Sequence, residues 1–249
     1  MEIQQDLVVS IVTVSYNSEK TIRDTIESVL HQTYTNIEYW IIDGASKDDT
    51  VAIAKEYEAA FAERGMQYHI ISEPDKGIYD AMNKGIKNCT GTLIGIINSD
   101  DWYEEQAVER VVDTFHKTDF DMFYADIRLI KEQGEMIKHS RYRKYATSRD
   151  WNHPTTFVRR SVYDRFLYQC VSVHDDWDFV LKVRNAGYKI TVLNEVLANF
   201  RVGGISNKGS MRDAVSRCKA RYRIYRENGM SRLYLLECIA MEVAKMILR

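Results

Sequence analysis

Polar and acidic side chains directly follow three apolar segments of the chain, and their types suit a ligand that carries phosphate or a metal ion. The three groups are Ser15-Tyr16-Asn17 after residues 8–14, Asp43-Gly44 after 37–42, and Asn98-Ser99-Asp100-Asp101 after 92–98. Alone, each group has a simpler interpretation: Asp43-Gly44 could form an ordinary turn, 98–101 could cap the next helix, and Tyr16 could be a surface tyrosine. Ligands of open α/β sheets bind beyond the carboxyl ends of the strands, so three such groups favour a binding site. The Asp100 and Asp101 carboxylates are hard oxygen ligands that suit Mg²⁺ or Mn²⁺ bound to a phosphate.

The elements that must position these groups alternate between strand and helix through the first hundred residues. The strand-like runs are 8–14, 37–42, 68–72 and 92–98, and the helical patterns between them are 18–32, 49–63 and 78–88. Asn17 or Ser18 is the expected N-cap of the first helix, and Gly65 is expected just past the end of the second. Nearly continuous apolar strands joined by helices predict a Rossmann-like, mostly parallel central sheet with helices on both faces.

The second half of the chain is less regular. It shows a helical pattern near 104–117, a strand at 120–125 and a hairpin about Gly134, followed by a helix at 175–186, a strand at 188–200 and mostly helix over 211–249. No linker is visible between these segments. We therefore expect one α/β domain over residues 1–207, with a helical C-terminal extension over 208–249 packed on it.

Composition excludes several classes of protein. The chain has 249 residues and a net charge of −2, which gives no electrostatic case for nucleic-acid binding. It contains neither GxxxxGK[ST] nor GxGxxG after the first strand, which argues against a P-loop enzyme and a dinucleotide-dependent oxidoreductase. The four cysteines form no CxxC pair, and the N-terminal segment lacks the positive charge of a signal peptide. We expect a cytoplasmic protein.

The last 39 residues are basic, because 211–249 hold nine Lys/Arg and four Asp/Glu, a balance of +5. One interpretation is a basic helix over 211–226 that contacts anionic lipid at the inner face of the plasma membrane. The other is a solvated face of a helix packed on the catalytic domain. The apolar run 233–248 suits packing on the core or on a second subunit, as in a homodimer.

Six segments over roughly residues 8–207 can be compared with known families: SIVTVSYNSEKTIRDTIESVLHQTYTNIEYWIIDGASKDDT, SEPDKGIYDAMNKGI, GIINSDDWY, HPTTFVRR, HDDWDFVLKVRNAGY and FRVGGIS. In this order they resemble a family 2 glycosyltransferase with the GT-A fold. Within the family, the second and last segments are most similar to those of bacterial surface-polysaccharide transferases, including the colanic acid type.

The resemblance implies inverting transfer of a sugar from a nucleotide-diphosphate sugar, UDP being favoured, to a hydroxyl of a saccharide acceptor. The acceptor would be a lipid-linked oligosaccharide in bacterial surface-polysaccharide biosynthesis. Asp100 would bind Mn²⁺ or Mg²⁺, and Asp176 would be the general base. The implied donor-binding residues are Ser15, Tyr16, Asn17, Asp43, Asp75, Lys76, Gly77, Asp80, Asn83, Asn98 and Ser99.

One position departs from the family's DxD motif, because Asn98 stands where the first Asp is usual. An amide in place of a carboxylate removes one charge, which predicts weaker metal binding. Asp101 could compensate in part.

Asp176, the implied general base, lies in the first turn of the predicted helix 175–186, next to two other acidic residues. A helix N-terminus favours an ionised carboxylate, whereas the neighbouring Asp175 raises the pKa of Asp176. Without the resemblance, Asp175 would be an N-cap and Asp176 an ordinary first-turn acid, and Asp178 is a second candidate for the base. Candidates for the acceptor side or a closing segment are His153, Asp175, Gly203, Gly204 and Ser206, although a structural histidine and an ordinary loop are the simpler readings.

Two other functions stay open. A non-catalytic relative that binds nucleotide-sugars or acts as a scaffold is supported by Asn98. A nucleotidyltransferase is the second alternative, but that class has a Gly-rich, basic loop after the first strand, where this chain has SYNSEKT.

Overall fold

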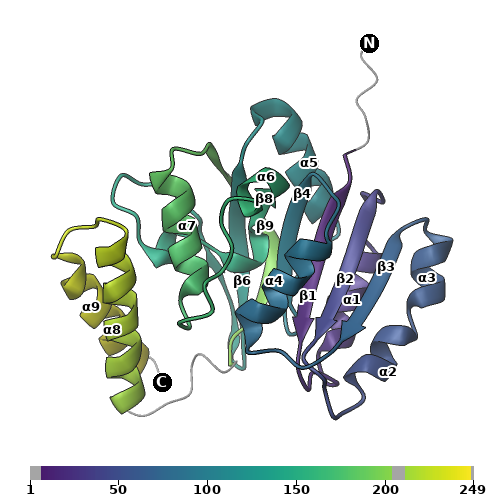
Figure 1. Cartoon of the computed structure of the whole chain (residues 1–249), viewed down its shortest axis with the longest axis horizontal. Helices are drawn as coiled ribbons and strands as arrows, with labels where there is room; N and C mark the ends of the chain where they lie inside the picture. Colours follow the sequence, from purple (N-terminus) through teal and green to yellow (C-terminus); the bar gives the residue numbers. More distant parts are fainter. Residues whose placement is uncertain (1–6, 204–210, 248–249) are drawn as a thin grey trace.

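A computed structural model describes residues 7–203 and 211–247 of the chain, with side chains up to Ala244. Within these residues, nine strands form one sheet in the order β3-β2-β1-β4-β8-β6-β9-β5, with β7 paired to β6. Helices cover both faces of this sheet (Figure 1). The expected α/β arrangement with helical cover is confirmed.

The half of the sheet that contains the N-terminal strand is entirely parallel. Its strands are β1 (Val9–Ser15), β2 (Ile37–Asp43), β3 (Gln67–Ser72) and β4 (Leu93–Asn98). β1 lies between β2 and β4, and the register pairs Ser15 with Asp43, Val14 with Asn98, and Asp43 with Ser72. The polar groups that follow these strands therefore meet at one edge of the sheet, as expected from their order.

The other half of the sheet is mixed, although most of the paired residues of the whole sheet are parallel, as expected. β8 (Phe157–Arg159) lies antiparallel between β4 and β6 (Met122–Lys131), and β9 (Ile190–Arg201) then pairs parallel with β6. The short β5 (Trp102–Tyr103) and the hairpin strand β7 (Gly134–Lys138) are also antiparallel to their partners. Strands of two or three residues carry no readable periodicity, so β5 and β8 were not predicted.

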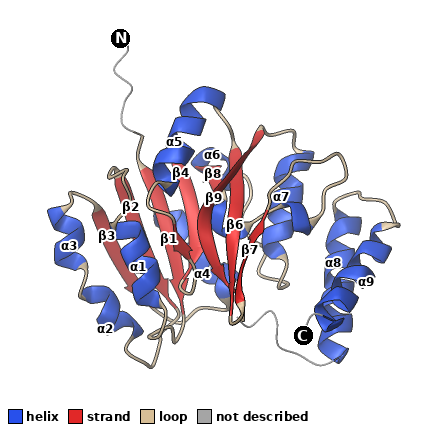
Figure 2. Cartoon of the chain, turned by 180° about the vertical axis from the view of Figure 1, so that it is seen from behind, coloured by secondary structure: helices blue, strands red, loops and turns tan. Residues whose placement is uncertain are grey.

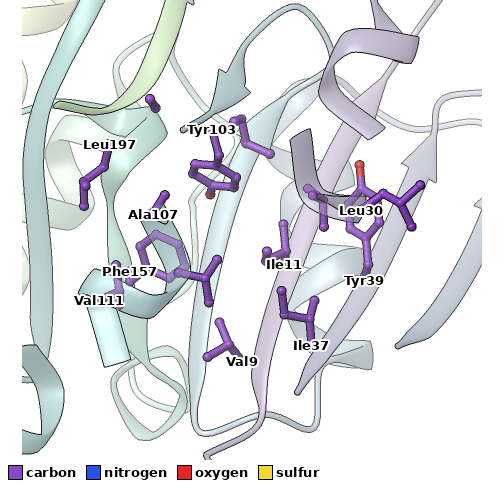
Figure 3. Close-up of a cluster of buried hydrophobic side chains, with 14 of the residues drawn as sticks. Val9, Ile11, Leu30, Ile37, Tyr39, Tyr103, Ala107, Val111, Phe157 and Leu197 are labelled. Atoms are coloured by element: carbon purple, nitrogen blue, oxygen red, sulfur yellow. The ribbon is translucent and has the colours of Figure 1, made fainter. Parts of the chain in front are cut away.

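Two hydrophobic clusters lie on the two faces of the sheet. The first is formed with α1 (Ile22–Leu30), α2 (Thr50–Lys55), α3 (Glu58–Glu63) and α5 (Ala107–Thr118), and Figure 3 shows part of it around Ile11, Tyr39 and Phe157. The second is formed with α4 (Ile78–Asn88), α6 (Arg160–Tyr163) and α7 (Asp175–Asn185). Burial of both faces makes the strands nearly continuously apolar.

The C-terminal extension consists of α8 (Met211–Glu227) and α9 (Tyr234–Ile247), which lie side by side at the end of the molecule far from β3 (Figures 1 and 2). α8 packs on α7: the rings of Trp177 and Tyr225 are 6.3 Å apart, and Asn228 Nδ2 donates to Asp178 Oδ1 at 2.7 Å. The expected break at Asn228-Gly229 is present. No helix in the described ranges is long and apolar enough to cross a membrane.

Two local predictions need correction. The first helix begins at Ile22 after Thr21, not after Asn17 or Ser18, because the Ser18 hydroxyl contacts Ser99 at 2.7 Å instead of capping the helix. The predicted helix 49–63 is interrupted at Glu56 and Tyr57, where it separates into α2 and α3. Gly65 follows α3 with φ +69°, as a C′ glycine should.

Candidate active site

Asp43 organises the loops at the carboxyl edge of the parallel strands. Its side chain is fully buried and accepts four hydrogen bonds. The donors are the hydroxyls of Ser15, Ser46 and Ser72 and the backbone N–H of Ser46. These bonds use the lone pairs of both carboxylate oxygens. In this structure Asp43 and the buried Ser15 therefore hold the loops after β1, β2 and β3 together and do not point into solvent.

The loops after β1, β2 and β3 also approach one another closely at Gly44. A Cβ placed on Gly44 would lie 2.4 Å from Asp75 Oδ2 and in ordinary contact, 3.4 Å, with the Tyr16 ring, so a side chain there would displace the Asp75 carboxylate. The Tyr16 side chain is 63% exposed at this point. Asn17 has φ +50°, and its Oδ1 accepts a hydrogen bond from the Lys47 N–H at 2.8 Å. Together these residues form an open, polar surface around the exposed tyrosine ring.

The segment 75–80 forms a compact turn at the start of α4. Gly77, with φ +117°, donates its N–H to Asp75 Oδ1 at 2.7 Å, and Lys76 N–H donates to Asp80 Oδ2 at 3.0 Å. The side chain of Lys76 is left exposed to solvent. A cation at the tip of such a turn can contact a phosphate.

Asn83 lies one turn further along α4 and faces away from this turn. Its Nδ2 donates to the Tyr168 carbonyl at 2.8 Å, and its Oδ1 accepts the Tyr168 N–H at 3.1 Å. Both ends of the amide are thus bound to one backbone residue. In this structure Asn83 holds the loop that leads to α7.

The turn after β4 holds a desolvated pair of carboxylates. Burial raises the pKa of Asp100, while the charge of Arg201 lowers it. Burial, followed by the charge of Asp100, raises the pKa of Asp101 well above its usual value. The Arg201 N–H donates to Asp101 Oδ1 at 3.1 Å, and the Arg201 Nε donates to the Asp100 carbonyl at 3.2 Å.

The same turn has oxygen atoms with no partner in the part of the chain that the structure describes. Asn98 Oδ1 and Asp101 Oδ2 are buried and accept no hydrogen bond there. These atoms and the Asp100 carboxylate are all hard oxygen donors, which fit Mg²⁺ or Mn²⁺. No group of three or more His, Cys, Asp or Glu that could hold a metal lies in the described ranges, so a cation here would need ligand atoms from a bound molecule or water.

Asp176 occupies the first turn of α7 with an elevated pKa. Loss of solvent is the main cause and raises the pKa to about 6, with Asp175 adding to the rise. The Trp177 N–H, which donates at 2.7 Å, and the hydroxyl of Tyr79 both lower it. Tyr79 belongs to the first turn of α4, directly after the 75–77 segment. The carboxylate is therefore close to the turn that begins α4, and its pKa suits a general base.

The other acids of this helix have different partners. Asp175 is buried and accepts the N–H groups of Val171 and Ser172, both at 2.9 Å, so it holds the preceding loop. Asp178 is bound to Lys182 at 2.6 Å and to Asn228 of the extension. Neither acid is free to act as a base in this structure. His174, not Asp175, occupies the N-cap position.

His153 lies in a short 3₁₀ turn (His153–Thr155) beside Trp151, with the ring centroids 5.8 Å apart. Burial lowers its pKa to about 4, so the ring is neutral at neutral pH. Gly203 follows β9 with φ +141°, a conformation that favours glycine. Gly204 and Ser206 lie outside the described residues.

Two residues of the site were not singled out from the sequence. Tyr79 stands inside the segment SEPDKGIYDAMNKGI but gives no local sign that its hydroxyl reaches Asp176. Arg201 follows a strand and reaches back to the turn after β4, where it also binds Asp24 Oδ2 at 2.7 Å. Both contacts join residues about a hundred positions apart or more.

Comparison with known proteins identifies the family of this chain. A profile of glycosyl transferase family 2 matches residues 10–172. This chain belongs to glycosyl transferase family 2. Chondroitin synthase from Escherichia coli is 37% identical over 132 residues, which cover 53% of this chain and 19% of that protein. The alignments with four such curated relatives cover between 19% and 38% of those proteins.

Solved glycosyltransferase structures share the fold. S. aureus TarS 1–349 in complex with UDP-GlcNAc superposes with a TM-score of 0.71 at 16% identity, over 96% of this chain and 72% of that one. The mannosyltransferase PcManGT from Pyrobaculum calidifontis, in complex with GDP-Man and Mn²⁺, gives a TM-score of 0.68 at 14% identity, over 94% and 69%. The GT-A fold expected from the sequence is confirmed.

Proposed function

We propose that this chain is an inverting glycosyltransferase that moves a sugar from a nucleotide-diphosphate sugar to a hydroxyl of a saccharide acceptor. The observation that carries the proposal is the contact between Tyr79 and Asp176. It joins a carboxylate with a pKa of about 6 to the first turn of the helix that follows the 75–77 segment. A general base beside a donor-binding turn is what direct displacement requires.

In the proposed reaction the acceptor oxygen attacks the anomeric carbon of the donor sugar. The bond from that carbon to the diphosphate oxygen breaks, and its electron pair leaves with the nucleoside diphosphate. Asp176 accepts the proton of the acceptor hydroxyl. Because its pKa is about 6, the carboxylate is largely ionised at neutral pH and yet more basic than an ordinary aspartate. Asp175 and Asn83 act as positioning residues, since both hold the loop before α7.

The donor would lie over the loops that Asp43 holds together. We propose that Tyr16, Asn17, Asp75, Lys76 and Gly77 contact it directly. Asp43, Ser15, Asp80 and Ser99 would support these loops from beneath. The divalent ion would be held by Asp100, with oxygens of Asn98 and Asp101 nearby, and when bound it supplies positive charge that stabilises the departing diphosphate.

The finer assignments are also proposals. UDP as the nucleotide is supported by the resemblance and by the TarS complex, although PcManGT was solved with GDP-Man. The resemblance to surface-polysaccharide transferases supports a lipid-linked acceptor and a cytoplasmic location at the inner membrane face. It also supports a division of the chain into a transferase unit, residues 1–207, and an extension, residues 208–249. His153, Gly203, Gly204 and Ser206 remain candidates for the acceptor side or a closing segment.

Melting temperatures with UDP, GDP, CMP and dTDP, each with and without Mn²⁺, test the donor site. A ligand that binds only the folded chain raises the melting temperature. We expect one nucleotide, UDP, to do so in a metal-dependent way. An Asp100→Asn variant should lose the metal-dependent part, while Asp113→Asn on the exposed face of α5 should keep it. No shift with any nucleotide would contradict the proposed site.

One observation favours a second candidate function. Asn98 leaves this turn with one acid fewer than the DxD motif, as expected for a relative that binds nucleotide-sugars without transferring them. Nucleotide binding without turnover for any donor would support that function. Donor hydrolysis that disappears in Asp176→Asn would reject it.

A further inference from the structure

A wide basic groove lies outside the proposed donor and base sites, between residues 139–150 and helix α9. Its volume is about 780 Å³, and Arg141, Arg143, Lys144 and Arg149 line one wall while Leu236 lies on the other. Arg184 of α7 holds the basic segment by donating to the Arg143 carbonyl, and Arg149 Nε donates to Met241 Sδ of α9. The groove is therefore built from elements that are fixed to the rest of the molecule.

The positive charge of the groove is mostly uncompensated. Arg143 is paired with Asp150 at 3.5 Å. Across the residues that the structure describes, Arg141, Lys144 and Arg149 have no carboxylate within 4 Å of their side-chain nitrogens. Glu237 also lines the groove; burial raises its pKa, while the charges of Arg221 and Arg149 lower it. Three exposed cations thus face one groove, and arginine and lysine side chains of this kind bind phosphate groups.

An exposed apolar stripe on α9 continues the groove. Leu235, Leu236, Ile239 and Val243 recur at helical spacing on one face of the helix, and each is at least 41% exposed. Leu236 belongs both to this stripe and to the groove. The buried residues Cys238 and Glu242 lie on the adjacent face of α9, about a quarter of a turn from the stripe, so the stripe borders the buried face and is open to solvent. Tyr142 and Tyr145 are also exposed beside the basic residues, at 53% and 71%.

We propose that the groove and the α9 stripe together form a docking surface for a membrane that carries anionic phospholipid. The cations would contact the lipid phosphates, the leucine and isoleucine side chains would enter the boundary of the acyl chains, and the tyrosines would lie at the headgroup level. The proposal deepens the proposed function, since it rests on a lipid-linked acceptor that the membrane would present. It also moves the expected membrane contact from the basic residues of α8 to α9 and residues 141–149.

Charge favours a membrane over a second copy of the chain as the occupant. A twofold dimer through this surface would place the same patch of both copies face to face. The interface would then contain Arg141, Lys144 and Arg149 of both copies, which doubles its unpaired positive charge. An anionic lipid surface neutralises the same three charges.

Vesicle flotation of the full chain tests the proposal, with vesicles of phosphatidylcholine alone and of phosphatidylcholine mixed with phosphatidylglycerol. We expect binding only to the mixed vesicles, and weaker binding at high salt. The triple variant Arg141→Glu/Lys144→Glu/Arg149→Glu should lower the partition coefficient about a hundredfold or more, because each surface cation contributes about fivefold. Leu236→Ser/Ile239→Ser should also weaken binding, by about tenfold or more.

A matched control reverses three exposed lysines on other helices, Lys55→Glu/Lys87→Glu/Lys117→Glu, which changes the net charge equally. We expect this control to keep most of the binding. Equal losses in both triple variants would overturn the proposal, as would absence of binding to the mixed vesicles. A dimer that Leu236→Ser/Ile239→Ser dissociates without lipid would assign the stripe to a second copy. A melting shift with inorganic diphosphate that depends on Arg141, without vesicle binding, would assign the groove to a free anion.

The nucleotide-dependent melting shift, measured on the same variants, separates this proposal from the proposed function. If the shift persists while vesicle binding fails in the wild-type chain, only the docking surface is rejected. If vesicle binding follows the expected pattern but no nucleotide binds, only the donor site is rejected.

Discussion

Asp43 and Asp176 are acidic residues at the two sides of the proposed site, and the structure treats them in opposite ways. Asp43, after β2, is fully buried and receives four hydrogen bonds from neighbouring loops. Asp176, at the start of α7, is partly exposed, and its loss of solvent raises its pKa to about 6. Asp43 thus joins the neighbouring loops, whereas Asp176 has a pKa at which it can take up a proton.

This difference predicts how the two regions respond to substitution. A carboxylate whose lone pairs are all used stabilises the fold, so its loss should affect stability first. A carboxylate whose charged form is disfavoured contributes little to stability, so its loss should affect the reaction. The loops around Asp43 are thus held together by hydrogen bonds, whereas the pKa of Asp176 depends on its desolvated surroundings.

The largest effect is expected for Asp176→Asn. Removal of the general base should lower kcat by about 10²–10⁴-fold, because the acceptor hydroxyl keeps its proton. The nucleotide-dependent melting shift should be unchanged, since the donor loops are intact. Transfer or donor-hydrolysis rates measure the first effect, with Asp164→Asn, an exposed acid, as the control. A rate within tenfold of the wild type would show that Asp176 is not the base.

Asp43→Asn should mainly affect stability. The amide nitrogen would face hydrogen-bond donors where the carboxylate oxygen now accepts, which costs about 2–4 kcal/mol. For a chain of this size the melting temperature should fall by about 4–16 °C. Thermal unfolding measures the change. A stable variant that has lost nucleotide binding would instead mean that Asp43 contacts the donor directly. Asp43 would then have a role in binding and not mainly in stability.

The pH dependence of kcat/KM should report the state of Asp176. The base acts when ionised, so activity should fall as the pH drops through about 6. The Tyr79 hydroxyl lowers the pKa of Asp176, so Tyr79→Phe should move this acidic limb to higher pH. We expect activity about threefold lower at pH 6 and nearly unchanged at pH 8. An equal loss at both pH values would indicate that Tyr79 only shapes the site.

A change in metal binding, not in the base, is expected for Asn98→Asp, which completes the DxD motif. A further carboxylate beside Asp100 should lower the Mn²⁺ concentration needed for half of the UDP-dependent melting shift by about three- to tenfold. Without metal the variant should be less stable, since a third negative charge joins Asp100 and Asp101. Asn88→Asp, at the end of α4, is the control. An unchanged Mn²⁺ requirement would place the cation away from residue 98.

Local patterns in the sequence determined the first half of the fold. The strands β1 to β4 and the helices between them follow from apolar runs, helical spacing and turn residues, all of which act over a few positions. Their order then implied that Ser15, Asp43 and Asn98 end at one edge, and the register confirms it. Helical patterns also predicted α7 and the C-terminal helices, whereas the family resemblance covered only roughly residues 8–207.

Only the tertiary structure decided how the candidate residues are used. The bonds from Ser15 and Ser72 to Asp43 join distant parts of the chain. The pairing of Asn83 with Tyr168 and the contact of Tyr79 with Asp176 do the same. The insertion of β8 beside β4 and the outward apolar face of α9 depend in the same way on neighbours far along the sequence. Residue type and spacing indicate which chemistry is available at a position, but burial and partners set its pKa and its contacts, and these exist only once the chain has folded.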